Sequence, residues 1–484
     1  MDYIFGNLAN RPDVPPLVWN PDSKQSINPH MLICGGSGAG KTTLLLNIAK
    51  YLAMNNKHIY IFDLKGDMVV KDNDGEVIGN YIEFTAWNSQ YGINPFEFDT
   101  GVVEDELKEI IESNEMNEQQ RFKIQNSGPK VQVERFIEII KKNFLPNMGT
   151  NQKDILTYLL SDTYLSKGFK YNEIGTWLQE LPSLEDTLEL IKRIKSYSED
   201  NDGTVLDKKS NDFICFTQNQ IVELQREKAN ILKDGTAENK DEYEKVFNEY
   251  KEQIHKNLDE YIEYGLASFS KKNVAPNNEW FEEREIDIEK YMSKDALRTI
   301  DKLASYINAL VESGVFHSNR PPVKNGLNVV NISGLDVAIQ RFIVDVWLGK
   351  VFKSCKIRGN YAERPNKVRG AKCDTYAIVD ESKLIAGTSR DKNDPYSYLN
   401  RTATEARGFG FGLIVAAQSA EHFPPEFLKN FDAQVILNTG IADFDSVRKS
   451  FGIDKQFLEY TQQGYGNALV KTGRSFSKIK LELP

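Results

Sequence analysis

The chain has 484 residues, of which 40% are hydrophobic and 27% are charged, proportions that are ordinary for a globular protein. This length is enough for about two to four domains with substantial cores. The formal net charge of −10 argues against a protein whose whole surface is basic and wraps nucleic acid, although it is compatible with a local basic channel.

The cysteines and the apolar runs indicate the compartment. The four cysteines form no C-x-x-C pair and no zinc-binding spacing, and a disulfide framework is unusual in a chain of this size. Residues 1–5 lack the basic start and apolar run of a signal peptide. No stretch reaches the ~18 uninterrupted apolar residues of a membrane helix. We therefore expect a cytoplasmic protein without a membrane segment of its own.

Residues 1–30 are rich in proline and asparagine, contain a candidate edge strand at 17–19, and lead into a glycine-rich loop. The loop at 35–42 fits the pattern G-x-x-x-x-G-K-[ST], with an apolar strand before it and an apolar helical pattern after it. Backbone N–H groups and the helix N-terminus surround phosphate in such loops. The competing interpretation is a glycine-rich turn that happens to precede a helix, and the agreement of all three parts disfavours it.

This loop predicts a site for a nucleoside triphosphate. We expect Lys41 to reach the β- and γ-phosphates of ATP, and the Thr42 hydroxyl to hold Mg²⁺. The residues predicted to bind the nucleotide are Gly35, Gly36, Ser37, Gly38, Ala39, Gly40, Lys41, Thr42 and Thr43.

A second buried strand is predicted at 58–63, and it runs into the sequence Asp-Leu-Lys-Gly-Asp. Acidic groups at the carboxyl end of a strand in an open α/β sheet lie where ligands bind. A structural turn explains Asp63 and Asp67 equally well, because Gly-Asp turns are common. An extended segment at 91–96, stopped by a proline, then ends the first block of the chain.

Residues 101–325 are predicted to be helical, because their charge rises and their apolar residues fall at helical spacing. Ser183 and Asp186 have the spacing of a capping box at a helix start. The pattern at 219–264 favours one or two long helices, or an antiparallel pair that turns at 234–236. Charges of both signs alternate there, which favours a solvated helix face over a nucleic-acid contact.

The strand pattern returns at residue 326. A strand is predicted at 327–332, followed by a cap at Asp336 and an amphipathic helix at 339–352. A basic loop at 356–372 comes next, and both nucleic-acid contact and a solvated loop are open interpretations of it. Its cations are Lys356, Arg358, Arg364, Lys367, Arg369 and Lys372.

Two further strands end in polar side chains that suit phosphate chemistry. The strand at 376–379 runs into Asp380 and Glu381, and the strand within 407–417 ends at Gln418. We expect Asp380 to hold Mg²⁺ and Glu381 to orient or deprotonate the attacking water. Gln418 can read the γ-phosphate or position water, although a glutamine that caps a turn is a competing interpretation. A further strand at 435–439 completes a parallel sheet flanked by helices.

Six segments together resemble the HerA/FtsK superfamily of ring-forming P-loop motor ATPases, which includes VirB4- and VirD4-like members. The resemblance covers roughly residues 1–100 and 326–484 and leaves 101–325 outside. The segments are residues 29–42, IFDLKGD at 61–67, YGINPF at 91–96, NVVNISGL at 328–335, AIVDES at 377–382, and Arg407 with GFGLIVAAQS at 410–419.

The resemblance implies an α/β fold with a RecA-like core and a mostly parallel sheet, formed by residues 1–100 and 326–484 and interrupted by a helical insertion at 101–325. It also implies a hexameric ring that holds ATP and Mg²⁺ between subunits and threads double-stranded DNA. Within it, Glu381, Lys41, Gln418 and Arg407 are the candidate catalytic residues. Gln418 would be a sensor, and Arg407 a finger reaching a neighbour's ATP, with Arg401 as its rival.

The favoured function is therefore an ATP-driven translocase or helicase acting on double-stranded DNA. Two alternatives remain open. The chain could be an ATP-gated oligomeric scaffold for a nuclease or other effector subunit, or a conjugation or secretion ATPase that meets a membrane through another subunit. The superfamily branch is undecided, because no β-barrel fits before the loop and no membrane helix is present. A prokaryotic defence or mobile-element setting would suit each alternative.

Overall fold

The computed structural model describes residues 2–9, 11, 13–23, 26–98, 104–113, 115–125, 127–200, 204–231, 239–273, 276–364, 367, 370–381, 398–419, 423 and 425–482. Contacts divide the chain into a larger unit, Met1–Leu188 with Thr299–Pro484, and a smaller unit, Glu189–Arg298.

An eleven-stranded sheet forms the larger unit, in the order β2-β1-β11-β10-β9-β3-β8-β7-β4-β6-β5. The strands from β9 to β5 pair in parallel, whereas β10, β11, β1 and β2 are added antiparallel at one side. The predicted α/β fold with a mostly parallel sheet is thus confirmed. The strands are β1 (Tyr3–Leu8), β2 (Leu17–Trp19), β3 (Met31–Cys34), β4 (His58–Asp63), β5 (Asn80–Glu83), β6 (Leu327–Asn331), β7 (Thr375–Val379), β8 (Phe411–Ala417), β9 (Ala433–Ile436), β10 (Asn467–Thr472) and β11 (Phe476–Leu481).

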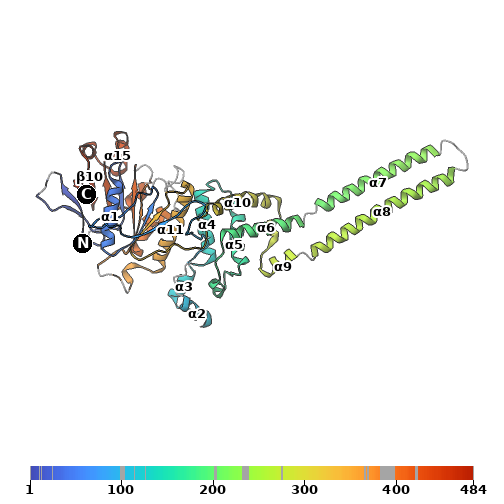
Figure 1. Ribbon diagram of the computed structural model, residues 1–484, viewed down its shortest axis with the longest axis horizontal. Helices are drawn as coiled ribbons and strands as arrows, with labels where there is room; N and C mark the ends of the chain where they lie inside the picture. Colours follow the sequence, from blue (N-terminus) through green and yellow to red (C-terminus); the bar gives the residue numbers. More distant parts are fainter. Residues whose placement is uncertain are drawn as a thin grey trace. The chain divides into compact units, whose positions relative to one another are not determined.

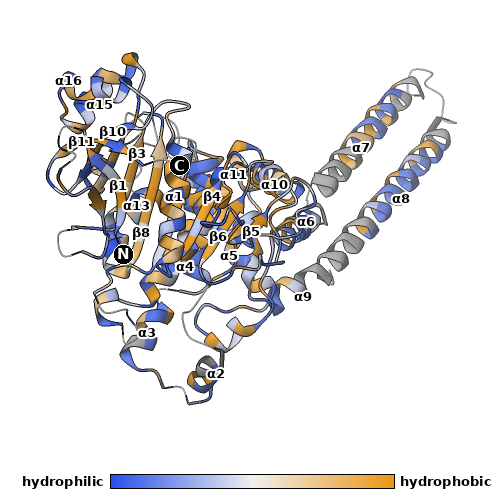
Figure 2. Ribbon diagram, turned by 60° about the vertical axis from the view of Figure 1, so that its left-hand side comes forward, coloured by the Kyte–Doolittle hydropathy of each residue, from blue (hydrophilic) through white to orange (hydrophobic). Residues whose placement is uncertain are grey.

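Helices cover both faces of the parallel part of the sheet. Helices α1 (Lys41–Met54) and α11 (Val337–Ile357) lie on opposite faces, and both are labelled in Figure 1. Successive side chains of β4 point to opposite faces, so Ile59 and Ile61 join the α1 core while Tyr60 and Phe62 contact Trp347 of α11. Because both faces are covered, β7 and β8 are buried throughout, and Figure 2 shows the strands mostly in the hydrophobic colour.

The first and last strands of the chain meet in the antiparallel part of the sheet. The candidate edge strand is confirmed as β2, which lies at the edge of the sheet and pairs with β1. The pairing of β1 with β11 brings Gly6 opposite Leu481. Gly6 has a φ of 138°, and a Cβ there would lie 2.0 Å from the carbonyl oxygen of Lys480. Only glycine fits this close approach of two backbones.

The elements described between β5 and β6 are helices, and several of them belong wholly or in part to the larger unit. Helix α4 packs on α11 through Lys142, whose Nζ lies 2.8 Å from both carboxylate oxygens of Asp345. The predicted capping box is confirmed, because Ser183 Oγ accepts from the N–H of Asp186 and Asp186 accepts from the N–H of Ser183. These helices are α2 (Glu104–Ser113), α3 (Glu118–Gln125), α4 (Pro129–Asn143), α5 (Thr150–Ser166), α6 (Leu184–Asp200) and α10 (Lys294–Glu312).

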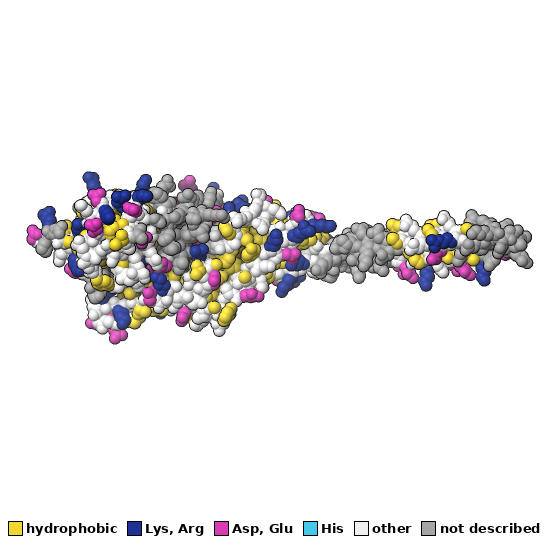
Figure 3. All heavy atoms as spheres, turned by 90° about the horizontal axis from the view of Figure 1, so that it is seen from above, with side chains coloured by type: hydrophobic (Ala, Val, Ile, Leu, Met, Phe, Trp, Pro, Cys, Tyr) yellow, Lys and Arg dark blue, Asp and Glu magenta, His cyan; other side chains and the backbone are white. Residues whose placement is uncertain are grey.

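In the smaller unit two long helices, α7 (Thr204–Ile231) and α8 (Asn239–Asn273), run side by side, as Figure 1 shows. Phe213 and Tyr261 stack between them, with ring centroids 5.3 Å apart and planes 11° apart. The turn expected at 234–236 lies outside the described residues. Figure 3 shows hydrophobic, basic and acidic side chains interleaved on the described part of this pair. The expected division of the chain at 100 and 325 stays a prediction.

The remaining helices are short. They are α9 (Pro276–Glu283), α13 (Tyr398–Glu405), α14 (Pro425–Lys429), α15 (Phe444–Phe451) and α16 (Lys455–Leu458). Within the described ranges, none of the helices is both long and apolar enough to cross a membrane.

Candidate nucleotide-binding site

The glycine-rich loop joins β3 to α1 and is anchored to the neighbouring strands. The N–H of Gly35 donates to the carbonyl oxygen of Ala417 at 3.1 Å, and the N–H of Gly36 donates to that of Asn438 at 2.7 Å. Gly38 and Gly40 have φ values of 73° and 93°, in the left-handed region that glycine favours. The loop therefore curls as the motif predicts, with Ser37 and Ala39 within it and Thr43 in the first turn of α1.

Lys41 lies under this loop with 7% of its surface exposed. Its Nζ donates to the carbonyl oxygens of Gly35 and Gly36, both at 2.8 Å. Burial lowers the pKa of Lys41, while the carboxylates of Asp380 and Glu381 oppose that shift. The ammonium group is thus already held at the loop, where phosphate oxygens can replace the two carbonyl groups.

Thr42 and Asp380 meet although they are far apart in the sequence. The Thr42 hydroxyl donates to Asp380 Oδ2 at 3.2 Å, and Asp380 Oδ1 accepts from the N–H of Glu381 at 2.8 Å. Asp380 follows β7 and is 2% exposed. A hydroxyl and a carboxylate are hard oxygen ligands of the kind that Mg²⁺ prefers, alongside water and substrate phosphates. The two predicted metal ligands therefore fit a shared Mg²⁺ site.

Both carboxylate oxygens of Glu381 accept hydrogen bonds. Oε2 lies 2.7 Å from Lys65 Nζ, and Oε1 accepts from Gln418 Nε2 at 2.8 Å. Glu381 is 6% exposed, and its φ of 50° lies in the left-handed region, which is unusual for a residue with a side chain. Each oxygen therefore already accepts one hydrogen bond, and an attacking water would have to share an oxygen with one of these donors.

Lys65 is the site residue that sequence reasoning missed. Partial burial disfavours its charge, but the hydrogen bond to Glu381 and the carboxylates of Asp380, Glu381 and Asp67 outweigh burial and raise the pKa of Lys65. The sequence places Lys65 directly after a predicted strand, which indicates the ligand-binding edge of the sheet but not the partner Glu381. In the structure, β4 and β7 end at that same edge.

The two acids beside Lys65 differ in their environment. Asp63 accepts from the N–H groups of Lys65, Gly66 and Met68 at 3.1, 2.7 and 3.0 Å, which favours the structural-turn interpretation for this residue. Asp67 is largely exposed, and its partial burial together with the negative charges of Asp63 and Asp380 raises its pKa. Asp67 therefore interacts electrostatically with the predicted metal ligand Asp380.

Arg407 and Arg401 lie away from this cluster. Arg407 is exposed in a 3-10 helix (Ala406–Phe409) before β8, whereas Gln418 follows the same strand. The seven residues of β8 separate the two ends by about 20 Å. Arg407 instead contributes, after burial, to lowering the pKa of His30 to about 3. Arg401 Nε lies 3.4 Å from Glu405 Oε1 on the same helix.

Several cations of the basic loop bind within the chain. Arg358 and Arg364 lie 3.4 and 2.9 Å from the carboxylate of Asp374, and Lys372 donates to the carbonyl oxygens of Ser23 and Ser26. Arg364 is 10% exposed. Arg369 lies outside the described residues. For Arg358, Arg364 and Lys372, an internal structural role explains the positive charge without a nucleic-acid contact.

Comparisons with known proteins agree with this geometry. The family described as "Helicase HerA, central domain" matches residues 5–351. The structure of VirB4 of Thermoanaerobacter pseudethanolicus is similar, with 13% identity, a TM-score of 0.55, and coverage of 100% of this chain and 96% of that chain. The bacterial conjugative coupling protein TrwBΔN70, in an unbound monoclinic form, has 12% identity, a TM-score of 0.50, and coverage of 95% and 86%.

Comparison with curated proteins finds no match. At these identities, VirB4 and TrwB support the fold alone. The family match covers more than half of the chain and includes the phosphate-binding loop, β4 and most of α11. The chain therefore belongs to the HerA family of P-loop ATPases.

Proposed function

We propose that the chain hydrolyses ATP at this site and uses the energy to move double-stranded DNA through an oligomeric ring. One observation carries the proposal. Lys41, Thr42, Asp380, Glu381 and Gln418 come from three neighbouring strands, β3, β8 and β7, and converge at the carboxyl ends of those strands. Ligands bind at this edge in open α/β sheets.

Each side chain has a defined part in hydrolysis. The Lys41 ammonium leaves the loop carbonyls and donates to phosphate oxygens. Thr42 and Asp380 would hold Mg²⁺, which would neutralise charge on the phosphates. Glu381 exchanges one of its two present donors for the attacking water and accepts its proton. Gln418, which donates a hydrogen bond to Glu381, then responds to the presence or absence of the γ-phosphate.

The position of Arg407 supports action between subunits. It is exposed, and about 20 Å of β8 separate it from its own nucleotide site, so it can serve only a neighbour's ATP. An arginine finger supplied in this way stabilises charge on the transferring phosphoryl group. A ring with shared sites is the arrangement that the proposal requires, and a hexamer is its expected form.

The test is ATP turnover of the purified oligomer with and without linear double-stranded DNA, at two salt concentrations. We expect turnover to rise with DNA and the rise to shrink in high salt, because phosphate contacts are salt-sensitive. Lys41→Ala and Glu381→Gln should abolish turnover, whereas Lys449→Ala, a change of an exposed lysine on α15, should not. Full turnover in both site variants would refute the site.

A second candidate function is an ATP-gated scaffold, and the surface of the smaller unit favours it. Ile214 and Ile262 each follow a member of the stacked Phe213–Tyr261 pair and are 49% and 47% exposed. In an antiparallel helix pair, the residues that directly follow the contacting residues face the same side of both helices, so Ile214 and Ile262 lie on one side. Ile221 and Leu258, at helical spacing, extend this apolar stripe.

Turnover that ignores DNA would favour the scaffold. In that case Ile214→Asp with Ile262→Asp should release a co-purifying effector subunit while leaving ATP turnover intact. A conjugation or secretion ATPase remains a further hypothesis, for which membrane recruitment through a second subunit would be the mark.

A further inference from the structure

A second cavity, of about 320 Å³, lies in the larger unit on the α11 side of the sheet. Its lining comes from β4, α4, α11 and the segments at 92–98 and 320–323. It shares no described residue with the candidate nucleotide-binding site. The volume is at the lower end of the range of about 300–1,000 Å³ that small-molecule sites occupy.

One end of this cavity is cationic. Arg135, Arg320, Lys350 and Lys353 line it, and among the described lining residues Glu97 is the one acid. Lys350 Nζ and Arg320 Nε lie 2.7 and 3.1 Å from the two oxygens of Glu97, so one carboxylate serves two cations. Lys353 is buried, with 7% of its surface exposed. The described lining therefore carries more positive than negative charge.

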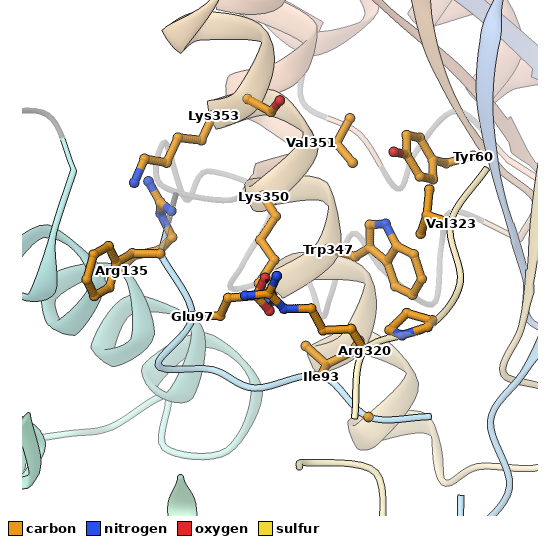
Figure 4. A pocket seen from close by; sticks show the side chains of 14 residues that line it. Tyr60, Ile93, Glu97, Arg135, Arg320, Val323, Trp347, Lys350, Val351 and Lys353 are labelled. Atoms are coloured by element: carbon orange, nitrogen blue, oxygen red, sulfur yellow. Dashed lines mark hydrogen bonds and ion pairs between the residues drawn. The ribbon is translucent and has the colours of Figure 1, made fainter. Parts of the chain in front are cut away.

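The other end is aromatic and apolar. Trp347 and Tyr60 lie with ring centroids 6.2 Å apart, and Val323 lies beside them. Figure 4 shows Arg135 and Lys353 on one side of the view, Trp347 and Tyr60 on the other, and Glu97, Lys350 and Arg320 meeting between them. The cavity thus offers a cationic end and a ring-lined end to one ligand.

The electrostatics of Lys350 agree with an anion-binding role. Burial lowers the pKa of Lys350, Glu97 opposes this, and the positive charges of Arg320 and Arg135 lower the pKa further. An anion placed among these cations would offset their mutual repulsion. Arginine side chains match phosphate oxygens with paired N–H donors, which makes phosphate the best-suited anion.

We propose that this cavity binds a nucleoside phosphate, with the phosphate among Arg135, Arg320 and Lys350 and the base against Trp347 and Tyr60. A flat base matches the ring-lined end, since aromatic rings prefer stacked or edge-on partners. The volume suits one nucleotide. The nucleotide is either free or the 5′-terminal residue of a strand, and the two sources share the same chemistry.

The test uses the full chain carrying Lys41→Ala, which removes the phosphate-loop lysine and separates this site from the first. Titration calorimetry with 5′-AMP should show one site per chain. Arg320→Glu, and separately Arg135→Gln, should weaken the binding of 5′-AMP by about tenfold or more, since each removes a charge-assisted hydrogen bond to the phosphate. The matched control is Arg448→Glu on α15, an arginine that is 51% exposed and also lies near a carboxylate.

A thermal unfolding curve for each variant establishes that the fold is kept. Absence of 5′-AMP binding, equal binding of adenosine, or equal losses in Arg448→Glu would overturn the proposal. A 5′-phosphorylated hexanucleotide that binds more tightly than 5′-AMP and is displaced by it would assign the site to a strand end, and the reverse order would assign it to a free nucleotide. ATP turnover of Arg320→Glu without the Lys41 change tests the proposed function separately.

Discussion

Removing the Lys65 ammonium should raise ATP turnover in the absence of DNA. Lys65 and Gln418 each donate to one oxygen of Glu381, at 2.7 and 2.8 Å, so an attacking water must compete with them for the proposed base. Lys65→Met frees Oε2 while keeping a side chain of similar length. A charge-assisted hydrogen bond contributes about 1.5–3 kcal/mol, and the 43% exposure of Lys65 places this one at the low end or below.

A release of about 1–1.5 kcal/mol corresponds to a rise in basal turnover of about tenfold. The assay is steady-state ATP hydrolysis without DNA, with Lys65→Arg as the control that keeps the charge. We also expect the ratio of DNA-stimulated to basal turnover to fall in Lys65→Met. A loss of turnover as deep as that of Glu381→Gln would refute the reasoning, because Lys65 would then help catalysis rather than block it.

Three further predictions concern residues that lie away from the cluster around Lys41 and Glu381. Burial lowers the pKa of His30 from its usual 6.5 to about 3. Between these pH values the unfolded chain binds one more proton than the folded chain. The free energy of unfolding therefore falls as the pH drops from about 6.5 toward 3. His30→Gln should remove up to about 1.4 kcal/mol per pH unit from this dependence in urea unfolding at pH 6 and 5, and an unchanged slope would contradict a buried neutral imidazole. Asp345→Ala leaves Lys142 buried without this carboxylate and should lower the free energy of unfolding by about 3–5 kcal/mol. The double variant Lys142→Met/Asp345→Leu should recover part of this loss. Equal losses in the single and double variants would count against the ion pair. Arg407→Ala should reduce ATP turnover about a thousandfold. Mixing Arg407→Ala subunits with Lys41→Ala subunits should restore part of the activity, because some mixed interfaces keep both Lys41 and Arg407. The absence of any recovery would contradict a finger that acts between subunits.

The site was predictable because its parts follow a shared rule. Each motif ends a buried apolar run, and parallel strands bring their carboxyl ends to one edge of the sheet. The sequence therefore predicted that Lys41, Thr42, Asp380, Glu381 and Gln418 would meet. The structure joins Thr42, Asp380, Glu381 and Gln418 by hydrogen bonds, while Lys41 donates to the carbonyl oxygens of the adjoining loop. Their catalytic roles stay proposals.

Contacts that depend on long-range packing were not predictable in the same way. Lys65 and Glu381 are 316 positions apart, and the identity of neither residue specifies the other as partner. The pairing of Lys142 with Asp345 across α4 and α11 has no local pattern either. The antiparallel strands β1, β10 and β11 were missed because their pairing depends on the two ends of the chain meeting.

The most direct test of the proposed motor is displacement of a third strand from linear double-stranded DNA. A translocating ring removes a triplex-forming oligonucleotide as it passes, and the release is followed by the fluorescence of the labelled strand. We expect ATP-dependent displacement by the wild-type chain and none by Glu381→Gln, although both bind the DNA. Rapid ATP hydrolysis on bound DNA without displacement would contradict the proposed motor and leave the scaffold as the better explanation.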